Sequence, residues 1–223
     1  CLLYDTDFSW RMLAENSGKT RTIGDLGSHW FDLLEHLTGQ KVTAVLGQFK
    51  VQYSERKRSL GYHEMFKKQE ETGCMENVAV DTEDMANVLF KMDNGAVGNA
   101  MFSQMCAGRK NELWINLDGT QASFNWNLEK PEELRIGKRG EGVLISRKDA
   151  ETLDEAAMAF AGYPAGHTEG FADAIYHGFR QFYDSMEKGK DAAVYADFQD
   201  GCRSMLLNEK IYESACKEQW VRI

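Results

Sequence analysis

Two side chains that could transfer a proton stand four residues apart in the first part of the chain. They are Asp25 and His29, the ends of the run DLGSH. On a helix this spacing puts both side chains on one face about one turn apart, so both can reach one substrate. A histidine near neutral pKa can take a proton from an alcohol, and a nearby carboxylate favours its protonated form. The pair predicts an acid–base site, although a helix-capping aspartate followed by a structural histidine is the alternative interpretation.

The same helical face continues through two further residues, which raises the alternative of a metal site. Asp25, His29, Asp32 and His36 follow one another at helical spacing. Oxygen and imidazole ligands could bind a divalent metal ion, as in a metal-dependent hydrolase or isomerase. Metal sites usually draw ligands from more than one element, and the helix dipole explains a histidine near a helix C-terminus. The sequence therefore favours a site without metal.

Three more residues are candidates for binding a substrate. Trp10 and Arg11 are adjacent, and an aromatic ring beside a guanidinium could line a sugar pocket by stacking and forked hydrogen bonds. His167 stands where a loop enters a predicted helix. The alternatives are a core tryptophan beside a solvated arginine, and an ordinary loop histidine. The sequence contains no G-x-G-x-x-G, Walker or G-x-S-x-G motif, so it predicts no cofactor-binding residues.

The elements that must position these residues begin with a helix and a strand. Apolar residues at helical spacing predict a helix from Asp25, as its N-cap, to Gly39. Alternating apolar and polar residues predict a half-buried strand over 42–53. The segment 54–77 is charged and has no clear period, which indicates an irregular excursion or flap.

The middle of the chain has the pattern of an antiparallel meander. The predicted strands are 85–92, 96–105, 110–117, 120–126, 134–136 and 143–145, with Asn-Gly and Asp-Gly turns among them. A helix over 168–188 is expected to bury Phe171, Ile175, Phe179, Phe182 and Met186, and is followed by a helix over 196–217 and a short strand over 220–223. These elements predict an α+β fold, in which helices pack on one face of a largely antiparallel, open-faced β-sheet.

Composition limits the class of partner. The formal net charge is −9, and Lys and Arg are scattered along the chain, which argues against a nucleic-acid-binding surface and for a polar small molecule. No stretch approaches the roughly 18 apolar residues of a membrane span. Five cysteines without a CxxC pair indicate reduced thiols and a cytoplasmic location. Because the chain opens on Cys1 and residues 1–4 have the pattern of a strand interior, we expect a fragment of a longer protein.

Several runs of the sequence resemble a known family. They are DTDFSWRM, TIGDLGSHWFDLLEHLTG, TEDMANVLFKMDNGAVGNAMFSQMCAGRKNELWINLDGTQASFNW and GHTEGFADAIYHGFRQFYDSMEKGK. Together they resemble the C-terminal domain of the glucose-fructose oxidoreductase, inositol dehydrogenase and rhizopine-catabolism family. The likeness extends through nearly all of the chain, and the ordered series D-L-G-x-H, N-G-A-x-G and G-T-x-x-S carries it.

The resemblance implies a role for each candidate residue. In this family an N-terminal Rossmann domain binds NAD or NADP and supplies a lysine, and the second domain supplies an aspartate and a histidine. Carried over, His29 is the acid–base group on the reacting hydroxyl, and Asp25 holds the substrate or the imidazole. Trp10, Arg11 and His167 map near the substrate pocket.

The resemblance also implies how the chain works within a larger assembly. Residues 1–223 are expected to form a substrate-binding and oligomerisation domain, with the Rossmann domain outside this sequence. The implied substrate is a sugar, polyol or cyclitol. The open sheet face is expected to form a homodimer or homotetramer, and this part alone is expected to be inactive. A non-catalytic sugar-binding or scaffolding domain of the same fold is the alternative.

Overall fold

The computed structural model describes residues 3–59, 75–189 and 194–223, which fall into two compact units. Unit 1 combines Cys1–Arg109 with Phe198–Ile223, and unit 2 is Lys110–Asp197. Each unit is considered by itself. Within the described ranges, no helix has both the length and the apolar character needed to cross a membrane.

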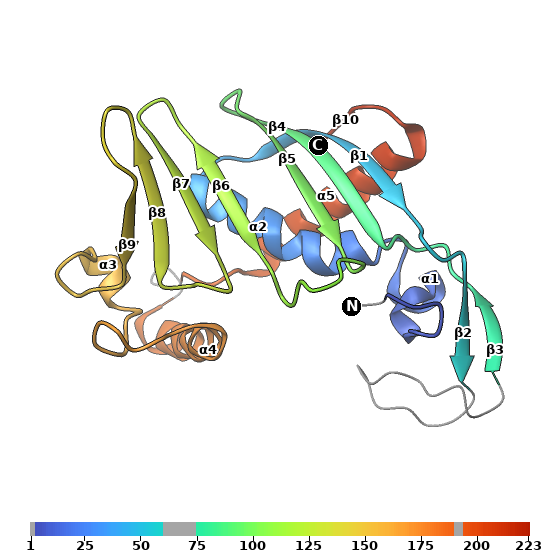
Figure 1. Cartoon of the computed structure of the whole chain (residues 1–223), viewed down its shortest axis with the longest axis horizontal. Coiled ribbons are helices and arrows are strands. Elements are labelled where there is room, and N and C mark those ends of the chain that lie inside the picture. The colour runs from blue at the N-terminus through green and yellow to red at the C-terminus, as the bar shows by residue number, and fades with distance from the viewer. Residues whose placement is uncertain (1–2, 60–74, 190–193) are drawn as a thin grey trace. The chain divides into compact units, whose positions relative to one another are not determined.

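Unit 1 is a four-stranded antiparallel sheet with helices on one face. Its strands, in the order β10-β1-β4-β5, are β10 (Val221–Arg222), β1 (Val42–Lys50), β4 (Met85–Met92) and β5 (Val97–Ser103). The helical segments are η1 (Trp10–Met12), α1 (Ala14–Ser17), η2 (Ile23–Gly27), α2 (Ser28–Thr38) and α5 (Phe198–Lys217). Figure 1 shows α2 and α5 on the same side of this sheet.

The core of unit 1 lies between that sheet face and α2. Along β4 the alternate residues Ala86, Val88, Phe90 and Met92 are buried, as the period of a half-buried strand requires. Rings from α2 and the sheet pack against one another, edge to face in four pairs and tilted in the Phe31–Phe102 pair; these are Trp30, Phe31, Phe90 and Phe102, with centroids 5.2 to 5.9 Å apart. The predicted strand over 85–92 is confirmed, and α+β architecture with it.

The α5 helix packs closely on β1 because a glycine lies at the contact. The amide of Gly47 donates to Ser214 Oγ at 3.0 Å, and a Cβ at Gly47 would lie 2.9 Å from the carbonyl oxygen of Ile211. A carboxylate on α2 also connects α2 to both β1 and α5. Glu35 on α2 accepts from the Val42 amide and from Arg203 on α5.

The charge of Glu35 is held by its partners. Burial opposes the charged form, but hydrogen bonds from Arg203, the Val42 amide and Lys41 outweigh it and hold the pKa of Glu35 below its ordinary value. The carboxylate therefore joins α2, β1 and α5 in its ionised form.

A second glycine in unit 1 lies under an aromatic ring. Gly98 on β5 is the cross-strand partner of Phe90 on β4, and a Cβ at Gly98 would lie 2.2 Å from the Phe90 ring. A ring that covers a cross-strand glycine shields backbone that a side chain would otherwise cover. The Phe90 ring therefore fills the space that a side chain at position 98 would occupy.

The prediction of an irregular segment over 54–77 is wrong at both ends. β2 (Glu55–Ser59) and β3 (Met75–Ala79) pair antiparallel, with Arg56 opposite Val78. Residues 60–74 lie outside the described residues, so the flap itself is untested. The strand β2 was missed because four of its five residues are charged, although Arg56 among them is fully buried. The expected strand over 1–4 is also absent from the described residues 3 and 4.

Unit 2 contains a second four-stranded antiparallel sheet, in the order β6-β7-β8-β9. Its elements are β6 (Trp114–Asp118), β7 (Ala122–Asn127), β8 (Glu133–Lys138), β9 (Leu144–Arg147), α3 (Glu155–Met158) and α4 (Phe171–Lys188). The predicted strands and hairpins of this region are confirmed within a few residues. Hydrogen bonding divides the predicted meander into separate sheets, because β5 and β6 are not paired.

The predicted burial on α4 is wrong. The five side chains Phe171, Ile175, Phe179, Phe182 and Met186 share one helical face, and they are 48% to 70% exposed. The helical period correctly shows which residues lie together. It does not show what covers them, and nothing in the described chain covers this face.

We predict that a methyl group at Gly47 destabilises the chain. Gly47→Ala places a Cβ against the backbone of α5, which can move only with the whole helix, and should lower the free energy of unfolding by about 1–3 kcal/mol. Gly201→Ala on α5 is the matched control, since a Cβ there meets open space and should add about 0.5–1 kcal/mol. Urea denaturation measures both, and equal effects of the two variants would contradict the close contact.

Candidate functional site

Asp25 and His29 lie on one continuous helical segment of unit 1. Asp25 is within η2, a π-helical turn, and His29 is in the first turn of α2; both residues are exposed. The prediction that Asp25 is the N-cap is wrong, because the helix has already begun and the Asp25 amide donates to the Arg21 carbonyl at 2.9 Å. The predicted end at Gly39, which is the C-cap of α2, is confirmed.

The helix begins before Asp25 because a distant carboxylate caps it. Glu83, just before β4, accepts from the amides of Arg21 at 3.0 Å and Ile23 at 2.8 Å. Amides of a first helical turn have no partner within the helix, so an acceptor from elsewhere stabilises the start. Thr22 Oγ1 also donates to the Glu83 carbonyl at 2.7 Å. The turn that carries Asp25 is thereby fixed to the start of β4.

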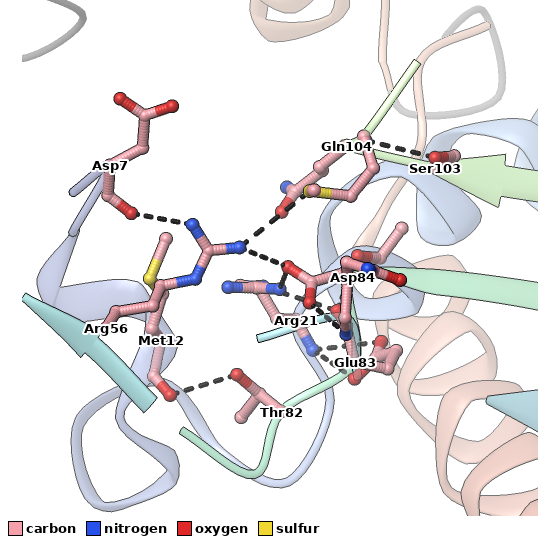
Figure 2. A network of polar contacts seen from close by, with 12 residues as sticks. Asp7, Met12, Arg21, Arg56, Thr82, Glu83, Asp84, Ser103 and Gln104 are labelled. Carbon is pink, nitrogen blue, oxygen red and sulfur yellow. Dashed lines mark hydrogen bonds and ion pairs between the residues drawn. The ribbon is translucent and has the colours of Figure 1, made fainter. Parts of the chain in front are cut away.

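Next to Glu83, one carboxylate joins two buried guanidinium groups. Asp84 Oδ1 accepts from Arg21 Nη2 and from Arg56 Nη2, the latter at 2.8 Å, and the three side chains are at most 3% exposed (Figure 2). Asp84 Oδ2 accepts from the Gln52 amide at 2.7 Å. We call Arg21, Arg56, Glu83 and Asp84 the buried ionic network.

Burial works against charge in this network. It lowers the pKa of Arg21, although the attraction and hydrogen bond of Asp84 partly restore it. Burial likewise raises the pKa of Glu83, and the hydrogen bonds from the Ile23 and Arg21 amides partly oppose that rise. The network therefore depends on complete pairing, because each charge would be costly alone.

The same network holds the segment that contains Trp10 and Arg11. Arg56 Nη1 donates to the carbonyls of Tyr4 at 2.7 Å and Asp7 at 2.9 Å, and Thr82 Oγ1 donates to the Met12 carbonyl at 2.9 Å. η1 is thus fixed at both sides.

Trp10 and Arg11 themselves point to the surface. Trp10 is 53% exposed, and the Arg11 guanidinium lies 5.6 Å from the centre of its ring. An exposed aromatic ring stacked with a cation can still bind a sugar face or a hydroxyl group. The alternative of a core tryptophan is wrong.

Gln104 connects the buried ionic network to Asp25. Its amide nitrogen donates to the Asp84 carbonyl at 3.0 Å, and its side-chain Nε2 donates to Asp25 Oδ2 at 3.3 Å. Gln104 and all four members of the buried ionic network are absent from the residues that the sequence predicted for the site. The only local signal was the pair Glu83-Asp84 directly before an alternating strand, where charges are unusual unless they are paired.

His167 lies in unit 2, whereas Asp25 and His29 lie in unit 1. It is exposed in the loop before α4. Its carbonyl accepts from Lys148 Nζ at 3.1 Å, and Lys148 also pairs with Glu169. Glu169 in turn accepts from the Gly162 amide at 2.7 Å. The ion pair therefore fixes the loop backbone at His167.

The alternative of a metal site would require a cluster of ligand side chains. In the stretches 3–59, 75–189 and 194–223, no three His, Cys, Asp or Glu residues are grouped as metal ligands would be. The face from Asp25 to His36 has the residue types of a metal site without that grouping. The described arrangement instead suits proton transfer and hydrogen bonding by two exposed groups on a fixed backbone.

A family model of an oxidoreductase domain matches nearly all of the chain. The profile described as "Oxidoreductase family, C-terminal alpha/beta domain" matches residues 4–223. The chain therefore belongs to this oxidoreductase family, the glucose-fructose oxidoreductase, inositol dehydrogenase and rhizopine-catabolism family, as the sequence motifs indicated.

Two relatives with similar sequences are a dehydrogenase and an uncharacterised oxidoreductase. Levoglucosan dehydrogenase of Pseudarthrobacter phenanthrenivorans is 26% identical over 230 residues, which cover 98% of this chain and 55% of that protein. An uncharacterised oxidoreductase, YfiI, of Bacillus subtilis is 31% identical over 140 residues, which cover 60% of this chain and 36% of that protein. The chain thus spans about half the length, or less, of these relatives.

Solved structures share the fold. A levoglucosan dehydrogenase in complex with NADH and L-sorbose superposes with a TM-score of 0.80 at 23% identity, covering 99% of this chain and 54% of that one. An inositol dehydrogenase homologue from Azotobacter vinelandii, complexed with NAD+, superposes with a TM-score of 0.77 at 24% identity, covering 96% and 51%. At this identity the likeness establishes the fold.

We predict that removing Glu83 loosens the helix that carries Asp25 and His29. Glu83→Ala should lower the free energy of unfolding by about 3–5 kcal/mol, because it leaves Arg21 with one buried counter-charge and two helix amides without an acceptor. Glu83→Gln should cost less, since its amide oxygen can still accept from Ile23. Urea denaturation and hydrogen exchange at the Ile23 amide measure the effect.

Glu76→Ala is the control for that measurement. Glu76 forms an exposed ion pair with Arg58 at 2.8 Å, and pairs of this kind contribute less than about 1 kcal/mol. If Glu83→Ala were no more costly than Glu76→Ala, the capping role of Glu83 would be wrong.

Proposed function

We propose that this chain is the substrate-binding and oligomerisation domain, over residues 1–223, of an NAD(P)-dependent dehydrogenase that acts on a hydroxyl group of a sugar, polyol or cyclitol. The observation that carries the proposal is the placement of Asp25 and His29, two exposed groups on one rigid helical segment. Support comes from the family to which the chain belongs and from the levoglucosan and inositol dehydrogenase relatives.

His29 takes the proton of the reacting hydroxyl. Oxidation of an alcohol removes a proton from oxygen and a hydride from carbon, and a bound nicotinamide would accept the hydride. The imidazole of His29 accepts the proton, or returns it in the reverse direction. Asp25, one turn away, accepts a hydrogen bond from a substrate hydroxyl or from the imidazole and so fixes the geometry. Trp10, Arg11 and His167 contribute to the substrate pocket.

The cofactor requires residues beyond this sequence. The pyrophosphate of NAD or NADP usually rests on a glycine-rich turn at a helix N-terminus, and this sequence has no such fingerprint. We therefore assign cofactor binding to the remaining part of the protein, and we expect this chain alone to be inactive. The alternative, a non-catalytic sugar-binding or scaffolding domain, has no need of an exposed histidine beside a carboxylate.

The open face of the unit 1 sheet is the proposed subunit interface. Opposite to α2 and α5, this face presents four apolar side chains, namely Leu46, Leu89, Val97 and Met101, of which Val97 is 76% exposed. A sheet face with this composition favours burial against another surface. A homodimer or homotetramer in which two such sheets pack together about a two-fold axis would bury this face.

We predict that the chain self-associates at tens of micromolar. Leu89→Glu places a charge in the middle of the apolar face and should weaken the dimer by at least about tenfold, because a buried unpaired charge is costly. Thr120→Glu, in an exposed turn of unit 2, adds the same charge and should leave association unchanged. Sedimentation equilibrium measures both; a monomeric parent chain would contradict the proposed interface.

We predict that His29→Ala in the whole protein lowers kcat by about 10²–10⁴, which is the usual contribution of a positioned acid–base group. Thermal stability should change little, because His29 is exposed and its removal leaves no packed cavity. His36→Ala is the matched control on the same helix, is also exposed and should retain activity. Steady-state kinetics with a sugar or polyol substrate and thermal denaturation give the two readouts.

Two other results would count against the proposal. Loss of stability with unchanged kcat in His29→Ala would make His29 a structural residue. Equal loss of activity in His29→Ala and His36→Ala, restored by a divalent metal ion, would instead support the metal-dependent alternative.

A further inference from the structure

Gln104 lies between the buried ionic network and the candidate acid–base pair. It directly follows β5, and its backbone amide donates to the Asp84 carbonyl at 3.0 Å, so its Cα is fixed to the base of β4. Its side chain extends to the π-helical turn, where Nε2 lies 3.3 Å from Asp25 Oδ2. These two residues are 79 positions apart in the sequence, and this hydrogen bond joins β5 to η2.

We propose that Gln104 is a positioning residue for Asp25, which orients the carboxylate so that its second oxygen faces the substrate. The proposal rests on the proposed function of Asp25 and adds a residue that lies outside the series D-L-G-x-H, N-G-A-x-G and G-T-x-x-S. Within the described residues, Asp25 Oδ1 has no hydrogen-bond donor, so it is the oxygen that can accept from a substrate hydroxyl.

The side-chain amide of Gln104 is placed at a cost in stability, which indicates that it is kept for its contact with Asp25. Its Oε1 is buried and has no hydrogen-bond donor among the described residues. An unsatisfied buried carbonyl is destabilising, and such groups in folded proteins often have a role in binding or catalysis. A leucine would fill similar space without that cost. The hydrogen bond from Nε2 to Asp25 is the contact that only the amide can provide.

Only one orientation of the amide suits a charged Asp25. Nε2 is a donor and Oε1 an acceptor, so rotation of the amide would place two acceptor oxygens against each other. A donor to a carboxylate favours its charged form. A glutamate in the same place would repel it. Gln104 therefore selects the direction of the Asp25 carboxylate.

Apart from His29, the ionisable groups named here around this turn interact with one another. Arg21, Glu83 and Asp84 interact within the buried ionic network, and β5 itself contains no ionisable residue. On α5, which also packs against η2, Lys210 and Glu213 pair at 2.8 Å. His29 is one turn further along the helix. A change in the titration of Asp25 on substitution of Gln104 can thus be attributed to the lost donor.

The test combines two substitutions of Gln104 with a control of equal charge. Gln104→Glu keeps the shape and replaces the donor by a negative charge, and Gln104→Leu removes only the polar group. Gln121→Glu is the control, because Gln121 is exposed in the turn between β6 and β7. Carboxyl NMR of the chain follows the titration of Asp25, and kinetics of the whole protein follow kcat and KM across pH.

The expected results differ between the variants. In Gln104→Glu the midpoint of the Asp25 titration should rise by at least about 0.7 pH unit, which is the shift for two like charges about 4 Å apart in bulk water, and by more where the protein surface lowers the dielectric constant. The acid limb of the kcat/KM profile should move in the same direction. Gln104→Leu should lower kcat/KM by about tenfold to a hundredfold, the range of a misplaced catalytic group, while thermal stability is retained. Gln121→Glu should change neither readout.

The outcomes separate this proposal from the proposed function. An unchanged Asp25 titration in Gln104→Glu would overturn the positioning role, whatever the kinetics. A shifted titration with an unchanged pH profile and unchanged kcat/KM in Gln104→Leu would overturn it as well, since the contact would then be structural. If Asp25→Asn and His29→Ala both retained full turnover, the proposed function itself would fail, and the NMR result would still decide whether Gln104 contacts Asp25.

Discussion

The structure of unit 1 depends on the buried carboxylate of Asp84, which accepts hydrogen bonds from two guanidinium groups. Arg21 precedes the helical segment, Arg56 belongs to β2, and Asp84 precedes β4, so one side chain fixes three segments that are distant in sequence. Such a network often adds little stability compared with apolar packing, but removing one member leaves an uncompensated charge. The network determines how these segments are positioned relative to one another. It therefore also positions the helical segment that carries Asp25 and His29.

The sequence predicted those elements that have a strong local pattern. The strand over 85–92 was found with its correct ends because buried and exposed residues alternate along it and an Asn-Gly turn follows. The start of the helix was missed because its cap, Glu83, is about 60 residues away and leaves no signal in the sequence next to the helix. On α4 the helical period correctly predicted which residues share a face, but the prediction that this face is buried was wrong. Periodicity identifies a face of a helix and does not show whether another element packs on it.

The site shows the same division. Asp25 and His29 could be selected because their spacing is local and their chemistry is specific. Gln104 and Glu83 could not, because glutamine and glutamate are common residues whose importance arises only from contacts across 60 to 80 positions. The candidate substrate residue His167 remains a prediction from resemblance, and the structure adds that Lys148 fixes its loop.

The ring of Phe90 over Gly98 constrains how this sequence can diverge. A mutation that gives position 98 a side chain would clash as long as the phenylalanine remains, whereas a smaller residue at position 90 would open a cavity in the core next to Trp30 and Phe31. Neither change is tolerated easily as a first step. Related sequences are therefore expected to keep the two residues together or to have exchanged them as a pair, so that co-variation between positions 90 and 98 would record the strand register in the evolutionary history of the domain.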